Sequence, residues 1–78
     1  MKTMADTTLK QLRLSLDATQ EQVLRRTRSV SLSTLKNAES GKRVTHGNAQ
    51  QILEALNSLL RDAGRPEVTM DDLGLTIY

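Results

Sequence analysis

The segment between Thr45 and Gly64 constrains the fold most, because its apolar residues recur at the spacing of a single helix face. Thr45 is suited to cap the N-terminus of this helix, and Gly64 and Pro66 are suited to end it. The apolar face consists of Ala49, Ile52, Leu53, Leu56 and Leu60. In a chain of 78 residues without internal repeats or a linker, this helix predicts one small domain.

Two shorter helices are expected before it. The first begins near Thr7 or Thr8 and carries an apolar stripe of Leu9, Leu12 and Leu16. The second runs from Gln20 to about Thr27, and Thr19 caps it in a capping box with Gln22.

A third helix is expected over residues 32–40. Ser31 is suited to cap it, and Val30 can pack on Leu35 as a hydrophobic staple. Gly41 is placed to end the helix in a left-handed turn.

A short turn of helix over residues 70–73 is expected near the end of the chain. Thr69 can cap it, and an extended apolar tail follows over residues 75–78. We therefore predict an all-α domain of four to five short helices over residues 7–78, preceded by a flexible arm over residues 1–6.

The third helix has a narrow apolar face and a broad polar face. At 100° per residue, Thr34, Leu35 and Ala38 lie on one side, and Glu39 lies at the border. The other side carries Leu32, Ser33, Lys36, Asn37 and Ser40. Hydroxyl, ammonium and amide groups read base edges in the major groove of DNA, although the same groups are common on ordinary solvated helices.

Four segments of the chain resemble, in order, the XRE or lambda-repressor-like helix-turn-helix domains of bacteria and phages. They are LKQLR (9–13), TQEQVL (19–24), VSLSTLKNAESGKR (30–43) and THGNAQQILEAL (45–56). The resemblance covers a core over residues 9–56 and leaves an extension over residues 57–78. It implies a helix-turn-helix bundle that binds double-stranded DNA and regulates transcription, for example as a repressor at an operator.

The resemblance also implies roles for individual residues. The base-reading residues of the recognition helix are expected to be Leu32, Ser33, Lys36 and Asn37. The phosphate-contacting residues are expected to be Gln20, Ser40, Lys42 and Arg43. Two further residues, Arg13 and Glu39, are expected to form a partly buried structural ion pair.

The chain departs from the family pattern between its second and third helices. It has one additional residue between Thr19 and Val30, placed most simply near Arg28–Ser29, and it lacks the usual turn glycine. Leu24 stands where the family has alanine, which can tilt the recognition helix. Three cations outside the pattern either contact phosphates or are simply solvated: Arg25, Arg26 and Arg28.

Charge is divided unevenly along the chain. Residues 1–43 contain nine cations and four acids, for a net charge of +5, whereas residues 44–78 contain two cations and five acids, for −3. A basic half suits a polyanion, although a chance asymmetry of a solvated surface gives the same numbers. The acidic half suggests two alternatives to gene regulation: an antitoxin that binds a cognate toxin, or a protein-interaction module on the same fold.

The extension contains more apolar residues than four short helices need. They are Leu59, Leu60, Val68, Leu73, Leu75, Ile77 and Tyr78. We expect them to support a homodimer, in which residues 75–78 pair as a strand with their counterpart. The alternative is that the tail folds back over its own domain.

Other classes of function find little support in the sequence. Without cysteine the chain has no disulfide and no thiolate zinc site, and His46 is its only histidine. No arrangement typical of an enzyme, a metal site or a cofactor site is present, so we expect none of these. No apolar run approaches a membrane span or a signal peptide, which predicts a cytoplasmic protein. The family resemblance implies a prokaryotic protein that is nucleoid-associated when bound to DNA.

Overall fold

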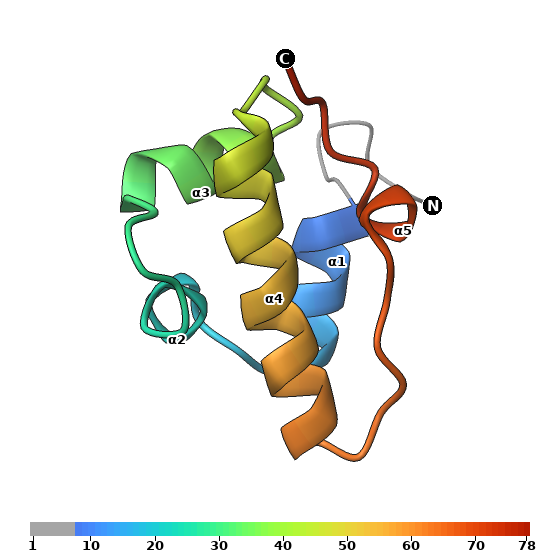
Figure 1. Ribbon diagram of the computed structural model, residues 1–78. Coiled ribbons are helices and arrows are strands. Elements are labelled where there is room, and N and C mark those ends of the chain that lie inside the picture. Colours follow the sequence, from blue (N-terminus) through green and yellow to red (C-terminus); the bar gives the residue numbers. More distant parts are fainter. Residues whose placement is uncertain (1–7) are drawn as a thin grey trace.

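Residues 8–78 are described by a computed structural model, and they form five helices (Figure 1). The helices are α1 (Thr8–Ser15), α2 (Gln20–Leu24), α3 (Leu32–Glu39), α4 (His46–Asp62) and α5 (Met70–Leu73). The expected all-α class is therefore confirmed. The expected arm over residues 1–6 and the expected cap at Thr7 lie outside the described residues.

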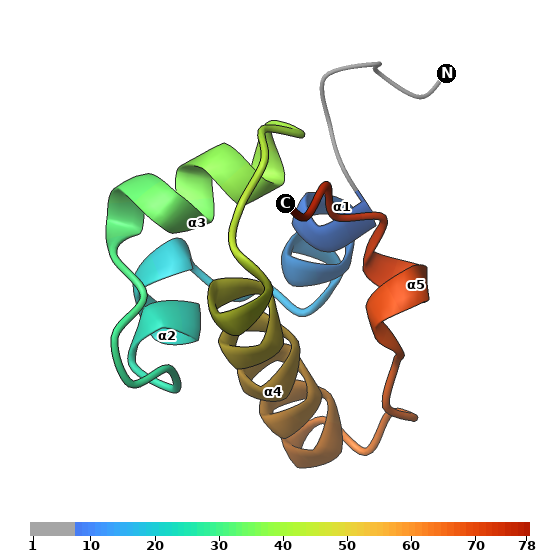
Figure 2. The same cartoon turned by 45° about the horizontal axis from the view of Figure 1, so that its top comes forward.

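The long helix α4 runs through the middle of the molecule and organises the others. Helices α2 and α3 lie on one side of it and α5 lies on the other, and all three contact α4. Helix α1 packs against both α3 and α5 (Figure 2). None of the helices within residues 8–78 is long and apolar enough to cross a membrane.

Three helices begin at the caps that the sequence predicts. The hydroxyl groups of Thr19, Ser31 and Thr45 accept hydrogen bonds from backbone N–H groups three residues further on, at 3.1, 3.2 and 3.2 Å. The Gln22 side chain completes the capping box, because it accepts from the Thr19 N–H at 2.8 Å. Gly41 has φ of 87°, in the left-handed region, directly after α3 ends.

Helix α2 is shorter than expected, because it ends at Leu24 rather than near Thr27. The N–H groups of Arg26 and Thr27 bond to carbonyls three residues back, at 3.0 Å each, which tightens the last turn. The Thr27 hydroxyl also donates to the Leu24 carbonyl at 2.7 Å, so this carbonyl is satisfied without a further helical turn.

The turn between α2 and α3 is held by a side chain of α4. The Gln51 Oε1 atom accepts from the backbone N–H groups of Arg28 and Ser29, at 2.9 and 3.0 Å. The Gln51 Nε2 atom donates to the Ser29 hydroxyl at 3.0 Å. The position where the sequence has an additional residue is thus fixed to the central helix.

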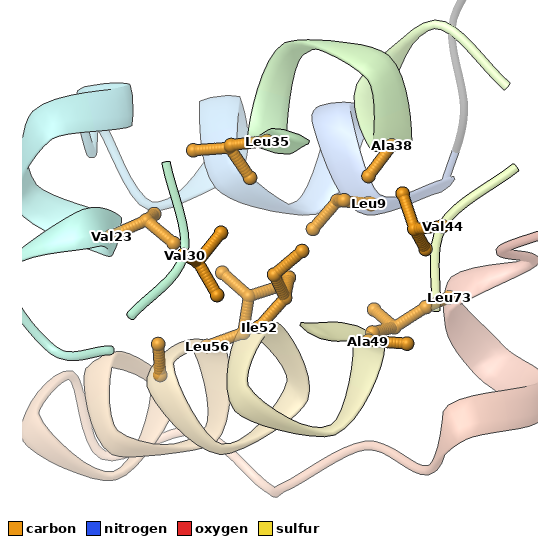
Figure 3. Packing of buried hydrophobic residues seen from close by; sticks show 11 residues of the cluster. Leu9, Val23, Val30, Leu35, Ala38, Val44, Ala49, Ile52, Leu56 and Leu73 are labelled. Atoms are coloured by element: carbon orange, nitrogen blue, oxygen red, sulfur yellow. The ribbon is translucent and has the colours of Figure 1, made fainter. Parts of the chain in front are cut away.

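Helices α1 to α5 all contribute to one aliphatic core (Figure 3). Its buried residues are Leu9, Val23, Val30, Leu35, Ala38, Val44, Ala49, Ile52, Ala55, Leu56 and Leu73. The predicted face of α4 is buried except at Leu53, which is only partly buried. Burial of this apolar surface is the main force that holds the five short helices together.

The segment after α4 is held against this helix by the side chain of Asn57. The Asn57 Nδ2 atom donates to the Val68 carbonyl at 3.0 Å, and the Asn57 Oδ1 atom accepts from the Val68 N–H at 2.8 Å. Asn57 therefore replaces the backbone partner that Val68 would have in a strand, and it fixes the path toward α5.

The C-terminal tail folds back on its own chain. Ile77 forms a parallel bridge with Val44, in which the Val44 N–H donates to the Thr76 carbonyl at 2.9 Å. The Tyr78 N–H donates to the Val44 carbonyl at 3.1 Å. Of the two expected roles of the tail, the structure shows the fold-back within one chain, and dimerisation stays a prediction.

Candidate nucleic-acid interface

Helix α3 is anchored on one face and open on the other. Its inner face is formed by Leu35, Ala38 and Glu39, which are all buried. The expected base-reading residues are all exposed on the other face: Leu32, Ser33, Lys36 and Asn37. Leu32 is 45% exposed, so it adds an apolar side chain to this otherwise polar face.

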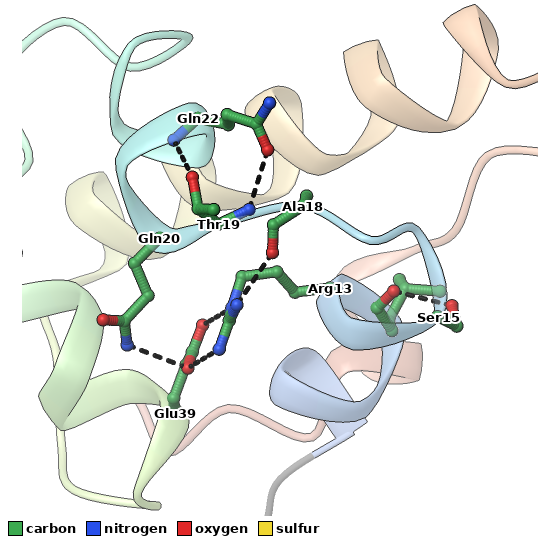
Figure 4. Close-up of polar contacts among 8 residues, drawn as sticks. Arg13, Ser15, Ala18, Thr19, Gln20, Gln22 and Glu39 are labelled. Atoms are coloured by element: carbon green, nitrogen blue, oxygen red, sulfur yellow. Dashed lines mark hydrogen bonds and ion pairs between the residues drawn. The ribbon is translucent and has the colours of Figure 1, made fainter.

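A buried network of hydrogen bonds holds the inner face of α3 through Glu39 (Figure 4). Arg13 of α1 donates to Glu39 through Nε at 2.6 Å and through Nη2 at 3.0 Å. The third Arg13 contact is from Nη1 to the Ala18 carbonyl, at 2.8 Å. The predicted ion pair is present, and its two-pronged geometry fixes both the position and the rotation of α3.

Gln20 joins the same network, which its expected role did not include. Its Nε2 atom donates to Glu39 Oε1 at 3.1 Å, so the first residue of α2 is tied to the last residue of α3. An amide nitrogen carries two N–H donors. The bond to Glu39 therefore leaves one donor of this half-buried side chain for a phosphate.

Exposed cations without acidic partners lie on and next to α3. Within residues 8–78, neither Lys36 on the outer face nor Lys42 in the following turn forms an ion pair. Arg43 is also exposed, and its guanidinium lies over an aromatic ring rather than beside a carboxylate. With the exposed hydroxyl of Ser40, these groups form a basic border at the C-terminal end of α3.

Two of the cations outside the family pattern are engaged elsewhere. Arg25 pairs with Glu21 at 2.7 Å within the same turn of helix. Arg26 pairs with Asp62 of α4 at 2.7 Å and also donates to a serine of that helix. Arg28 is exposed, and its backbone rather than its side chain is held by α4. Among residues 8–78, Arg25 and Arg26 thus have acidic partners, unlike Lys36 and Lys42.

Tyr78 is the residue of this surface that sequence reasoning missed. Its ring centroid lies 5.3 Å from the Arg43 guanidinium carbon, and Tyr78 as a whole is 72% exposed. The signal available in the sequence was that Tyr78 is the only aromatic residue of the chain. Nothing in the spacing of residues 43 and 78 indicates that they meet.

The dimensions of α3 suit a groove of double-stranded DNA. An α-helix with its side chains is about 10–12 Å in diameter. The major groove of B-DNA is about 12 Å wide and admits one helix with its side chains. The acidic helix α5 lies on the opposite side of α4, so its carboxylates do not cover the outer face of α3 (Figures 1 and 2).

The described residues bring together no other site of comparable chemistry. No group of three histidine, cysteine, aspartate or glutamate side chains lies close enough to hold a metal ion within residues 8–78. His46 is exposed at the first position of α4.

Comparison of the chain with protein-family models, with curated proteins and with solved structures found no match. The geometry of α2, α3 and the turn that follows α3 therefore carries the functional argument.

Proposed function

We propose that this chain binds double-stranded DNA in a sequence-specific manner and regulates transcription by occupying an operator. The observation that carries the proposal is the contrast between the two faces of α3. Leu35, Ala38 and Glu39 lock the helix in place, whereas the opposite face presents the exposed side chains of Leu32, Ser33, Lys36 and Asn37. A helix held this firmly, with so little of its own surface used for packing, is suited to insertion into a groove.

The exposed side chains have the chemistry to distinguish base pairs. An amide such as that of Asn37 pairs with adenine, and an ammonium such as that of Lys36 pairs with guanine. The Ser33 hydroxyl can bond to several bases, and Leu32 can contact a thymine methyl group. Specificity would then reside in four neighbouring residues of one helix.

Affinity would come mainly from the DNA backbone. Lys42 and Arg43 lie in the turn that follows α3, and Ser40 lies just before them. Contacts of this type neutralise phosphates, release counterions and fix the register of the protein without reading sequence. The free donor of Gln20 would add a contact at the start of α2.

Membership of the lambda-repressor-like helix-turn-helix family is part of this proposal. Its support is the sequence of capped helices over residues 9–56 and the buried Arg13–Glu39 pair, which several members of that family share. The additional residue before α3 does not weaken this support, because Gln51 fixes the turn that contains it.

The alternative of a protein partner on the acidic half has less support. Three of its five carboxylates are engaged within the chain. Asp62 pairs with Arg26, Glu67 with Arg61 at 2.9 Å, and Asp72 accepts the Thr69 N–H at 2.8 Å. Among residues 8–78, no ion pair is formed by Lys36, Lys42 or Arg43, so DNA is favoured over a toxin.

Selection of bound sequences from a pool of random duplexes, with the purified full chain, tests the proposal. We expect a recurrent site whose affinity falls steeply with salt. A homodimer, if the mass in solution shows one, should select two half-sites separated by about 34–36 Å. Recovery of no preferred sequence, or no binding even at low salt, would contradict the proposal and favour a protein partner.

A further inference from the structure

Arg43 and Tyr78 form a contact between the turn after α3 and the end of the chain. The guanidinium carbon lies 5.3 Å from the ring centroid, within the range of a cation–π interaction. Both side chains are exposed, so neither contributes to the aliphatic core. A contact between two exposed groups at the border of the candidate interface needs an explanation other than core stability.

The backbone beneath this contact is fixed by the parallel bridge. Val44 donates to Thr76 and accepts from Tyr78, so both of its backbone groups are paired. Val44 is buried and Ile77 is half-buried, on the inner side of the bridge. Because side chains alternate along extended segments, the residues next to them, Arg43 and Tyr78, meet on the outer side.

We propose that Tyr78 is a positioning residue for DNA binding, which holds the Arg43 guanidinium ready for a backbone phosphate. The inference rests on the function proposed above and extends the DNA-binding surface to residues 75–78. A free arginine loses considerable rotamer freedom when it binds a phosphate. Tyr78 reduces this loss because the guanidinium lies over the ring, and a cation–π interaction holds the cation without using its N–H donors.

A comparison of four variants with the wild type, on a selected duplex and on a scrambled duplex, tests the inference: Tyr78→Leu, Tyr78→Phe, Arg43→Ala and the double variant. Tyr78→Leu removes the aromatic face and should weaken binding to both duplexes by roughly two- to five-fold. Tyr78→Phe keeps the ring and should bind like the wild type. In an Arg43→Ala background, Tyr78→Leu should cause no further loss, because the contact that it removes is already absent.

Other results would show whether the proposed DNA binding is wrong or only the proposed role of Tyr78. If the wild type binds no duplex, the proposed function fails and the inference fails with it. If Arg43→Ala weakens binding while Tyr78→Leu leaves it unchanged, only the inference is overturned. Equal losses from Tyr78→Leu with and without Arg43 would also overturn it, because Tyr78 would then act independently of Arg43.

A measurement without DNA examines the contact itself. The side-chain protons of Arg43 should show upfield ring-current shifts by NMR in the wild type and in Tyr78→Phe, and these shifts should be lost in Tyr78→Leu. Backbone spectra of all variants verify that the fold is retained. Arg43 protons at ordinary shifts in the wild type would overturn the inference whatever the DNA results.

Discussion

Arg13 in α1 and Glu39 at the end of α3 form an ion pair inside the molecule, with Nε and Oε2 2.6 Å apart. Their side chains are only 10% and 4% exposed. Since the pair lies directly behind the face of α3 that is open to solvent, it determines how that face is presented. The same carboxylate accepts a hydrogen bond from Gln20, so side chains of α1 and α2 both bind Glu39 of α3.

Loss of one partner of this pair should destabilise the protein strongly. Arg13→Met or Glu39→Leu alone leaves a buried charge without its partner, and we expect the free energy of unfolding to fall by about 3–5 kcal/mol. The double variant removes both charges and should recover most of this loss. Urea unfolding followed by circular dichroism measures all three variants. Single losses below about 1 kcal/mol would show that the pair behaves like a surface ion pair.

Gln51→Ala should loosen the turn before α3. The change leaves the exposed N–H groups of Arg28 and Ser29 without their protein acceptor, and we expect a loss of about 0.5–1.5 kcal/mol in the free energy of unfolding. Gln50→Ala is a matched control, because Gln50 is exposed one position earlier on the same helix. Hydrogen exchange at the amides of Arg28 and Ser29 should accelerate in Gln51→Ala alone. Equal effects of the two substitutions would contradict the assigned role of Gln51.

Asp17→Gly should stabilise the protein. Asp17 has φ of 55°, in the left-handed region, where a residue with a side chain is strained and glycine is not. We expect a gain of about 0.5–1 kcal/mol in the free energy of unfolding. Asp17→Ala removes the charge near the end of α1 but keeps a Cβ atom that is strained in the left-handed region, so it separates the two contributions. A gain of the same size in Asp17→Ala would attribute the effect to charge rather than to backbone strain.

Lys42→Gln should weaken DNA binding without changing its specificity. If Lys42 neutralises one phosphate, the slope of log affinity against log salt should decrease by about 0.9. Arg65→Gln is the control, because Arg65 is an exposed cation in the segment after α4. This segment leaves α4 at the end of the helix that points away from α3 (Figure 1). Fluorescence anisotropy over a salt series gives both slopes. An unchanged slope for Lys42→Gln would remove Lys42 from the phosphate contacts.

The fold was predictable from the sequence where its determinants are local. Thr19, Ser31 and Thr45 act as caps through hydrogen bonds that span three residues, and such patterns are visible in the sequence. The two faces of α3 follow in the same way from a period of 3.6 residues. The Arg13–Glu39 pair was predicted from the family resemblance, since the two residues are 26 positions apart.

Most features that were not predicted are contacts of a side chain with the backbone or side chain of a residue far away in the sequence. Gln51 binds a turn 22 and 23 residues earlier, and the contact of Tyr78 with Arg43 depends on the return of the tail. The early end of α2 depends on a hydroxyl of Thr27 that is equally compatible with a longer helix. Hydrophobic periodicity carries no information about such contacts, because it reports only which face of an element is buried.

The most direct measurement of the central claim compares wild type and Asn37→Ala on a selected duplex and on a scrambled duplex of equal length. If α3 reads bases through its exposed face, Asn37→Ala should weaken binding to the selected duplex by about 1–3 kcal/mol. Binding to the scrambled duplex should not change, and Gln50→Ala, which removes an exposed amide from α4, should alter neither. Equal losses on the two duplexes, or none on either, would contradict the assignment of α3 as the helix that reads DNA sequence.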